Sequence, residues 1–236
     1  MLDLIDAVVL VSSVLVNLAA FTHYLAETLA RRLVLAALTG AWLGLAVGLG
    51  GAGKLAFSPQ QPVPLIGVLL VVPLVTIGLL ALRSARTRAA LLAIPMPVLI
   101  GLNSARVFGV LFLLLAAAGR LSGPFPYFAG LGDMVTGALA IPLAVRVARS
   151  TQVPTGAIRL WNLFGALDLL VAVGLGLMSA NGSPMQLFHG GVGSDAVQHL
   201  PTCLIPTVLV PFYLITHAIV AAKLAEGRAV PALAHS

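Results

Sequence analysis

Charged residues are scarce in this chain of 236 residues: Asp, Glu, Lys and Arg together make up 8% of it, whereas 60% is hydrophobic. A soluble domain is about a quarter charged and just under half apolar. A water-facing surface for a chain of this length needs many more charges. The scarcity excludes a soluble enzyme, a DNA-binding domain and a secreted disulfide scaffold, and we expect no nucleic-acid partner.

Cysteine is nearly absent as well. Cys203 is the single cysteine of the sequence, which excludes an internal disulfide and any cysteine-based metal or iron–sulfur site, and we predict no metal site elsewhere. The chain starts with acidic residues and not with the basic segment of a secretory signal, so the first apolar run is predicted to be a retained helix. The motifs of metalloproteases, prenyltransferases and rhomboid proteases are missing, and no residue is assigned a catalytic role.

The chain contains seven apolar runs, and most of them are near the length that crosses a bilayer. They predict an all-α, polytopic integral membrane protein, with residues 1–236 forming a single domain and seven transmembrane helices in one bundle. The predicted helices cover residues 6–26, 33–49, 63–82, 89–118, 127–147, 160–179 and 202–225.

Basic residues lie between these runs and predict an orientation. With the N-terminus outside, the outer side holds only Lys54 and Arg120, and the inner side holds ten basic residues. The positive-inside rule then places the N-terminus outside and the C-terminus in the cytoplasm. We expect a cytoplasmic (inner) membrane and its lipid bilayer as the surroundings. The ten inner residues are Arg31, Arg32, Arg83, Arg86, Arg88, Arg146, Arg149, Arg159, Lys223 and Arg228.

Prolines mark two of the runs as irregular. Pro95 lies near the front of run 89–118, which is too long for one perpendicular crossing, so we expect a kink or a short interfacial helix there. Pro201, Pro206 and Pro211 recur every five residues in and before the last run. Each proline removes a backbone hydrogen bond, which predicts that the outer part of this helix is bent or locally unwound.

Glycines at Gly40, Gly44 and Gly48 fall on one face of the second predicted helix. Small residues at a spacing of four let two helix backbones approach closely. We interpret this face mainly as internal packing, with a homo-oligomer or a partner subunit as the alternative. The loop at residues 181–201 is also rich in glycine and predicts a lid over the outer mouth of the bundle.

Four ionisable residues stand inside the apolar runs: Arg106, Asp133, Asp168 and His217. A charge at that depth is costly and needs a partner or a wet cavity. Counted at about 1.5 Å per residue from the helix ends, both aspartates lie near the middle of a hydrocarbon core about 30 Å thick, and so does Arg106. We therefore predict a pair between Arg106 and either Asp133 or Asp168.

One arginine cannot neutralise two carboxylates. The surplus carboxylate must be protonated, exposed to water, or paired with a protonated His217. A titratable carboxylate in mid-membrane is typical of a proton relay or coupling site. The alternative is an ion pair that only fixes the register of the helices. Asn103 and Asn162 fall close to Arg106 and Asp168 along their helices and are predicted to line the same site, while Trp161 is interpreted as an interfacial anchor.

Two histidines open a different possibility. His23 and His217 both fall in the cytoplasmic half, on the first and last helices, and a facing pair could hold a haem b. We rank first a small-solute or proton-coupled carrier that binds its ligand or proton at Arg106, Asp133, Asp168 and His217. The alternatives are a redox subunit that binds haem or quinone, and a membrane enzyme acting on a lipid. Beyond haem or quinone, no cofactor is predicted.

Overall fold

The computed structural model describes residues 2–58, 63–150 and 152–227, and every regular element in these ranges is a helix. Seven helices are long and apolar enough to cross a membrane, which confirms the all-helical class and the predicted number. Arg228, one of the ten inner basic residues, lies outside the described residues. The seven helices are Asp3–Leu25, Leu29–Gly51, Leu65–Arg83, Met96–Ala117, Phe125–Arg149, Thr155–Ser179 and Ile205–Ala225.

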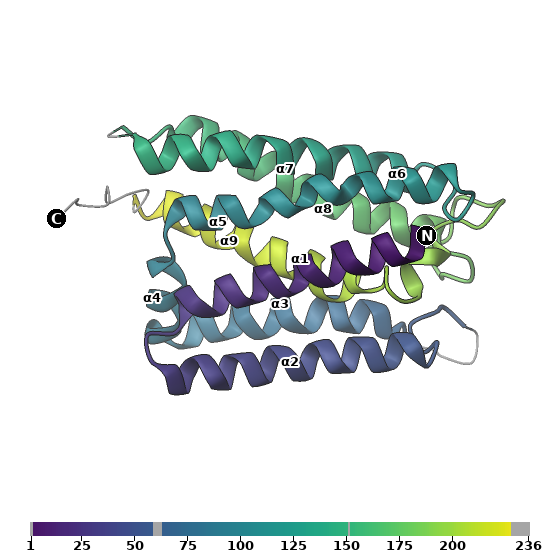
Figure 1. Ribbon diagram of the computed structural model, residues 1–236, viewed down its shortest axis with the longest axis horizontal. Coiled ribbons are helices and arrows are strands. Elements are labelled where there is room, and N and C mark those ends of the chain that lie inside the picture. The colour runs from purple at the N-terminus through teal and green to yellow at the C-terminus, as the bar shows by residue number, and fades with distance from the viewer. Residues whose placement is uncertain (1, 59–62, 151, 228–236) are drawn as a thin grey trace.

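These helices run side by side along the long axis (Figure 1). On one side lie α7 (Phe125–Arg149) and α8 (Thr155–Ser179), and on the other lie α2 (Leu29–Gly51) and α3 (Leu65–Arg83). Between them run α1 (Leu2–Leu25), the broken helix of residues 96–117, and the last helix. The last helix is the most buried of the seven, because it packs against α3, α8 and residues 96–102 together.

Basic residues gather at one end of the molecule. Nine of the ten predicted inner residues are described, and they lie on α4 (Ala85–Ala93) or on the helix ends that meet beside it in Figure 1. We call this the α4 end, and the opposite end, where α1 begins, the α1 end. Lys54 and Arg120 lie at the α1 end, after the helices that finish there. The charge asymmetry expected from the sequence therefore exists in the fold.

The predicted break near Pro95 is confirmed. α4 ends at Ala93, and α5 (Met96–Leu102) begins after Ile94 and Pro95, so α4 is a separate short helix. The carbonyls left open at the end of α4 accept hydrogen bonds from Lys223, whose Nζ lies 2.6 Å from the oxygen of Leu92 and 2.9 Å from that of Ile94. Lys223 thereby ties the last helix to α4.

The last helix is irregular, as its prolines predict. A π-helical turn, η3 (Ile205–Leu209), precedes α9 (Val210–Ala225). Pro211 has no N–H to donate to the carbonyl four residues earlier, that of Thr207. The indole Nε1 of Trp42 on α2 donates to this carbonyl instead, at 3.1 Å. The proline in α9 thus leaves a carbonyl available for a hydrogen bond from α2.

One irregularity was not predicted. Residues between α5 and α6 (Val110–Ala117) form a 3₁₀ helix, η1 (Asn103–Gly109), in the middle of the fourth long helix. The amide of Asn103 donates to the carbonyl of Leu99 at 3.0 Å, and a side chain that binds the carbonyl four residues back competes with the helical backbone. Arg106 stands at the centre of this segment.

The internal packing predicted for Gly40, Gly44 and Gly48 is wrong. All three are exposed, and among the described residues nothing lies within 4 Å of where a Cβ would stand. A close approach of two helix backbones lies elsewhere, between α7 and η1. A Cβ on Gly137 would overlap the backbone nitrogen of Val107, and one on Gly130 would lie 3.0 Å from the carbonyl oxygen of Gly109.

Candidate functional site

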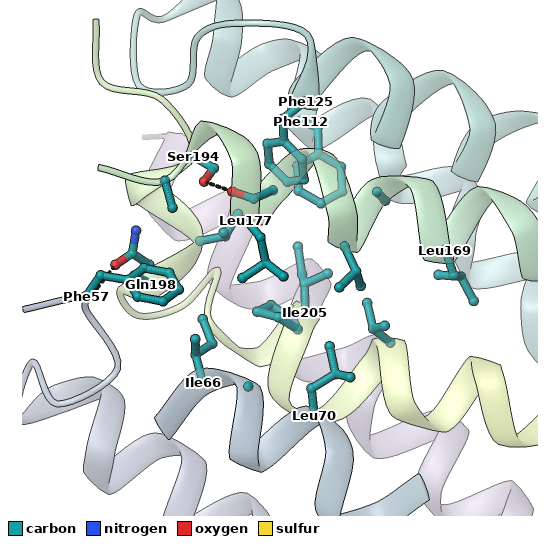
Figure 2. A pocket seen from close by; sticks show the side chains of 18 of the residues that line it. Phe57, Ile66, Leu70, Phe112, Phe125, Leu169, Leu177, Ser194, Gln198 and Ile205 are labelled. Atoms are coloured by element: carbon teal, nitrogen blue, oxygen red, sulfur yellow. Dashed lines mark hydrogen bonds between the residues drawn. The ribbon is translucent and has the colours of Figure 1, made fainter. Parts of the chain in front are cut away.

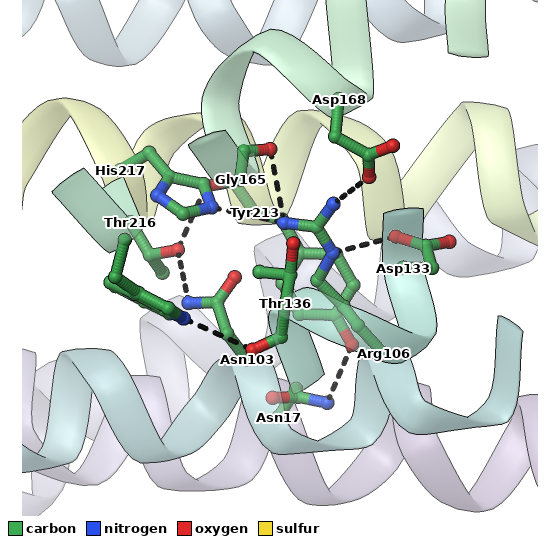
Figure 3. Close-up of polar contacts among 11 residues, drawn as sticks. Asn17, Asn103, Arg106, Asp133, Thr136, Gly165, Asp168, Tyr213, Thr216 and His217 are labelled. Carbon is green, nitrogen blue, oxygen red and sulfur yellow. Dashed lines mark hydrogen bonds and ion pairs between the residues drawn. The ribbon is translucent and has the colours of Figure 1, made fainter. Parts of the chain in front are cut away.

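Arg106 is the centre of the polar cluster, and its side chain is fully buried. Its guanidinium holds both aspartates at once: Nε lies 2.6 Å from Oδ1 of Asp133, and Nη2 lies 2.5 Å from Oδ2 of Asp168 (Figure 3). The sequence predicted that Arg106 pairs with one of the two aspartates, and it pairs with both. The three residues come from η1, α7 and α8, so the pairs join three helices.

The third guanidinium nitrogen, Nη1, faces the last helix. It lies 3.1 Å from the carbonyl oxygen of Gly165 and 3.0 Å from Nε2 of His217. A guanidinium can only donate, so Nε2 accepts, and His217 carries its proton on Nδ1. That nitrogen lies 2.9 Å from Oδ1 of Asn162, which can accept it. His217 is therefore neutral here, so of the three options for the surplus carboxylate the pairing with a protonated His217 is not the one formed.

Glycines make room for this arrangement. A Cβ on Gly165 would lie 2.7 Å from Cε1 of His217, and one on Gly132 would overlap the carboxylate of Asp168. The side chain of His217 therefore packs directly against Gly165, and that of Asp168 against Gly132. In the sequence Gly132 stands directly before Asp133, and Gly165 stands three residues before Asp168. These two spacings are the sequence features from which the packing could have been predicted.

Further polar residues line the guanidinium on the α1 side. The ring of Tyr213 lies under the guanidinium carbon at 5.7 Å, a cation–π contact, and its hydroxyl accepts from Nδ2 of Asn17 at 3.4 Å. Asn103 lies on the same segment as Arg106 and donates to Oγ1 of Thr216 at 3.2 Å. Tyr213 is the residue that the sequence reading missed, because a tyrosine in an apolar helix carries no signal of its own.

Trp161 is not an interfacial anchor. It is buried, its Nε1 donates to the carbonyl of Thr136 at 3.0 Å, and its ring lies 5.1 Å from that of His217. It packs behind the histidine and fixes the plane of the imidazole. The correction has a simple cause, since an aromatic residue near a helix end can face either the headgroups or a neighbouring helix.

The facing histidines needed for haem are not formed. His23 is exposed and its ring contacts that of Tyr24, whereas His217 is buried with both ring nitrogens in hydrogen bonds. In this arrangement no nitrogen of His217 has a lone pair directed at an iron. His23 and His217 therefore do not face each other in this structure, and haem binding stays a prediction.

The cluster is one positive charge short. An ionised Asp133 and Asp168 carry two negative charges, Arg106 carries one positive charge, and His217 is neutral. Asp133 and Asp168 are nearly buried, with 15% and 9% of their side chains exposed. A net charge in such surroundings is unfavourable, so the site favours binding of a further positive charge, a proton or a cation.

Two hollows reach the cluster from opposite ends. A cavity of about 190 Å³ runs from the α1 end down to Asp133, beneath the loop that precedes η3 (Figure 2). An open groove between α8 and α9 begins near Arg159 at the α4 end and reaches Asn162 and His217. Arg106 stands between the two, so each hollow meets a different partner of the same guanidinium.

Comparison with known proteins gives a family for most of the chain. The model of a domain of unknown function, DUF8737, matches residues 63–225. The chain belongs to the DUF8737 family. No curated protein and no solved structure matches it. The DUF8737 match includes Arg106, Asp133, Asp168 and His217, while α1 and α2 precede it.

Proposed function

We propose that this DUF8737 protein is a multi-pass protein of the cytoplasmic membrane that carries a small solute in exchange for, or together with, protons. The seven long apolar helices support insertion. The gathering of basic residues at the α4 end supports an orientation with that end in the cytoplasm and the N-terminus outside. The proposed binding and coupling site consists of Arg106, Asp133, Asp168 and His217, with Asn103 and Asn162 as supporting residues.

The observation that carries the proposal is the shared guanidinium. Arg106 binds Asp133 and Asp168 at hydrogen-bonding distance, and the cluster lacks one positive charge. A proton that binds either carboxylate removes its charge and weakens its pair with Arg106. The guanidinium is then held mainly by the other carboxylate. Proton binding thus changes which of the helices α7 and α8 is more strongly tied to η1.

Access from both ends supports a carrier over a purely structural ion pair. A pair that only fixes helix register needs no opening to either side. Here Asp133 lines the cavity at the α1 end, and His217 lines the groove at the α4 end. A carrier requires such a site between two alternately available paths.

The test is solute uptake by vesicles that contain the purified protein, with a pH gradient imposed in either direction. Radiolabelled amino acids, sugars, carboxylates and organic amines are supplied in turn. One-to-one coupling to a gradient of one pH unit sustains about tenfold accumulation. We expect one class to accumulate in this way, and Asp133→Asn and Asp168→Asn to abolish the dependence on the gradient.

Glu27→Gln is the matched control, because Glu27 is an exposed carboxylate whose ion-pair partner among the described residues is Arg31, one helical turn away. It should accumulate the solute as the wild type does. Failure of every class to accumulate under both gradients, or equal gradient dependence in the aspartate variants and the wild type, would reject the carrier. An absorbance spectrum of the purified protein tests the redox alternative: a Soret band lost in His217→Ala would replace the carrier with a haem protein.

A further inference from the structure

We propose that the cavity at the α1 end binds a small organic cation, an ammonium group on an apolar body, whose charge pairs with Asp133. The inference rests on the proposed function and names the substrate class of that site. Four features carry it: the lining of the cavity, the free oxygen of Asp133, the aromatic wall and the missing positive charge.

The cavity is lined almost entirely by apolar side chains from several helices. Figure 2 shows them converging from α3, α6, α7, α8 and η3. Such a lining excludes a sugar or another molecule with many hydroxyls, because each buried hydroxyl needs a partner. A cavity of about 150 Å³ is known to hold a benzene ring, so 190 Å³ accommodates a ring with a small substituent. The residues that define its walls are Ile66, Leu70, Phe112, Phe125, Leu169 and Val173.

Asp133 supplies the charge at the inner end of this cavity. Its Oδ1 is held by Nε of Arg106, and within the described ranges no side chain or backbone group hydrogen-bonds its Oδ2. An ionised carboxylate only accepts hydrogen bonds, so a ligand group that meets it must donate or carry a positive charge. Every ammonium group carries the charge, and a protonated amine donates as well.

The other polar groups along the cavity are already used. Oγ of Ser194 donates to the carbonyl of Gly176 at 2.6 Å. Gln198 accepts from the backbone of Phe57 at 2.8 Å and donates to Asp195 at 3.1 Å. An anion or a quinone, whose oxygens need donors, therefore finds few in this cavity.

The aromatic wall favours the same class. Phe112 and Phe125 stand edge to face with ring centroids 5.3 Å apart, and both line the cavity that Asp133 also lines. A cation near the face of a phenyl ring is attracted by its quadrupole, most strongly where water is excluded. An anion in the same place is repelled.

The charge deficit makes the cation and a proton competitors. Asp133 pairs with Arg106 on η1, and this guanidinium in turn contacts Asp168 on α8 and both Tyr213 and His217 on α9. A cation that enters supplies the missing positive charge, so a proton bound to the aspartate pair leaves to water. The apparent affinity should then rise about tenfold per pH unit while the pair titrates.

The experiment is equilibrium dialysis of radiolabelled phenyltrimethylammonium, whose charge does not depend on pH, against the detergent-purified protein. We expect saturable binding that strengthens as the pH rises, with proton release in weak buffer. Asp133→Asn should weaken binding at least about tenfold. Benzoate, an anion of similar size, should not compete.

Two variants guard against a folding defect. Ala172→Leu fills the cavity wall without changing any charge and should also abolish binding, while Glu27→Gln should leave it unchanged. Equal binding by the wild type, Asp133→Asn and Ala172→Leu would overturn the assignment, as would competition by benzoate.

The outcome separates this inference from the carrier proposal. If the vesicles accumulate another class of solute under a pH gradient but phenyltrimethylammonium does not bind, the substrate class is wrong and the carrier stands. If the cation binds and releases protons but no solute crosses the vesicle membrane, the cation site stands and the carrier fails.

Discussion

α2 and α7 both carry spaced glycines, and the two helices pack in opposite ways. On α2, Gly40, Gly44 and Gly48 are exposed and face no described residue. On α7, Gly137 meets the backbone of η1 so closely that a methyl group does not fit, and Gly130 lies in tight contact with it. Glycine spacing alone therefore does not say where two helices approach.

The difference lies in what stands beside the glycines. The close approach on α7 flanks Asp133, whose partner Arg106 lies on η1. The 2.6 Å hydrogen bond joins α7 to η1, and the glycines of α7 leave no side chain that would hold the two backbones apart. On α2 the hydrogen bond to another helix comes from the long side chain of Trp42, and among the described residues the glycine face meets nothing within 4 Å.

The largest expected effect follows removal of the group that draws α7, α8 and η1 together. Arg106→Ala leaves two buried carboxylates and His217 without their shared donor. Truncating one partner of a buried ion pair costs about 3–5 kcal/mol, and thermal unfolding in detergent measures it. Arg120→Ala is the control, because its pair with Asp3 is exposed and contributes about 0–1 kcal/mol. Equal losses in the two variants would show that the cluster does not hold the helices.

The next effect tests the close approach itself. Gly137→Ala places a methyl group against the backbone of Val107, and overpacking of this kind costs about 1–3 kcal/mol. A chain of this size should lose roughly 2–4 °C in melting temperature per kcal/mol. A melting temperature equal to that of the wild type would mean that α7 and η1 are farther apart than described.

A smaller effect is expected at Gly132, where the neighbour is the end of a side chain and not backbone. Gly132→Ala should displace the carboxylate of Asp168 from Arg106, and an off-rotamer side chain costs about 0.5–1.5 kcal/mol. Binding of phenyltrimethylammonium should persist, because Asp133 keeps its place. Its pH dependence should change, since the competing proton now meets a different pair. An unchanged pH profile would remove Asp168 from the coupling site.

The smallest effect is expected on α2. Changing any one of Gly40, Gly44 and Gly48 to Ala should leave stability unchanged or raise it by up to about 1 kcal/mol, because alanine favours the helix and meets no described residue. Light scattering of the detergent-purified protein measures its oligomeric state at the same time. Loss of a dimer in such a variant would show that the face packs against a second chain, which the sequence left open as the alternative.

The sequence predicted well those features that depend on composition along one helix. The seven apolar runs, the break at Pro95 and the irregular turn near Pro206 follow from hydropathy and from the missing N–H of proline. The meeting of Arg106, Asp133 and Asp168 also followed, because depth along a helix can be counted from its ends.

Features that depend on the rotation of helices about their axes were not predicted. Trp161 and His23 lie near helix ends, and nothing local says which of them faces inward. The neutral state of His217 depends on a guanidinium from another helix, which occupies Nε2. The 3₁₀ segment around Arg106 likewise reflects contact with α7, since no proline marks it.

The 3₁₀ segment has a mechanical consequence of its own. It rises about 2.0 Å and turns 120° per residue, whereas an α-helix rises about 1.5 Å and turns 100°. Over the seven residues of η1, a change to α-helical bonding would shorten the fourth long helix by about 3.5 Å and twist α5 against α6 by roughly 140°. Arg106 lies in the middle of η1, so the change would move its side chain and it could not keep all its hydrogen-bond partners. Whatever exchanges the partners of this guanidinium also sets the length and twist of the helix that carries it.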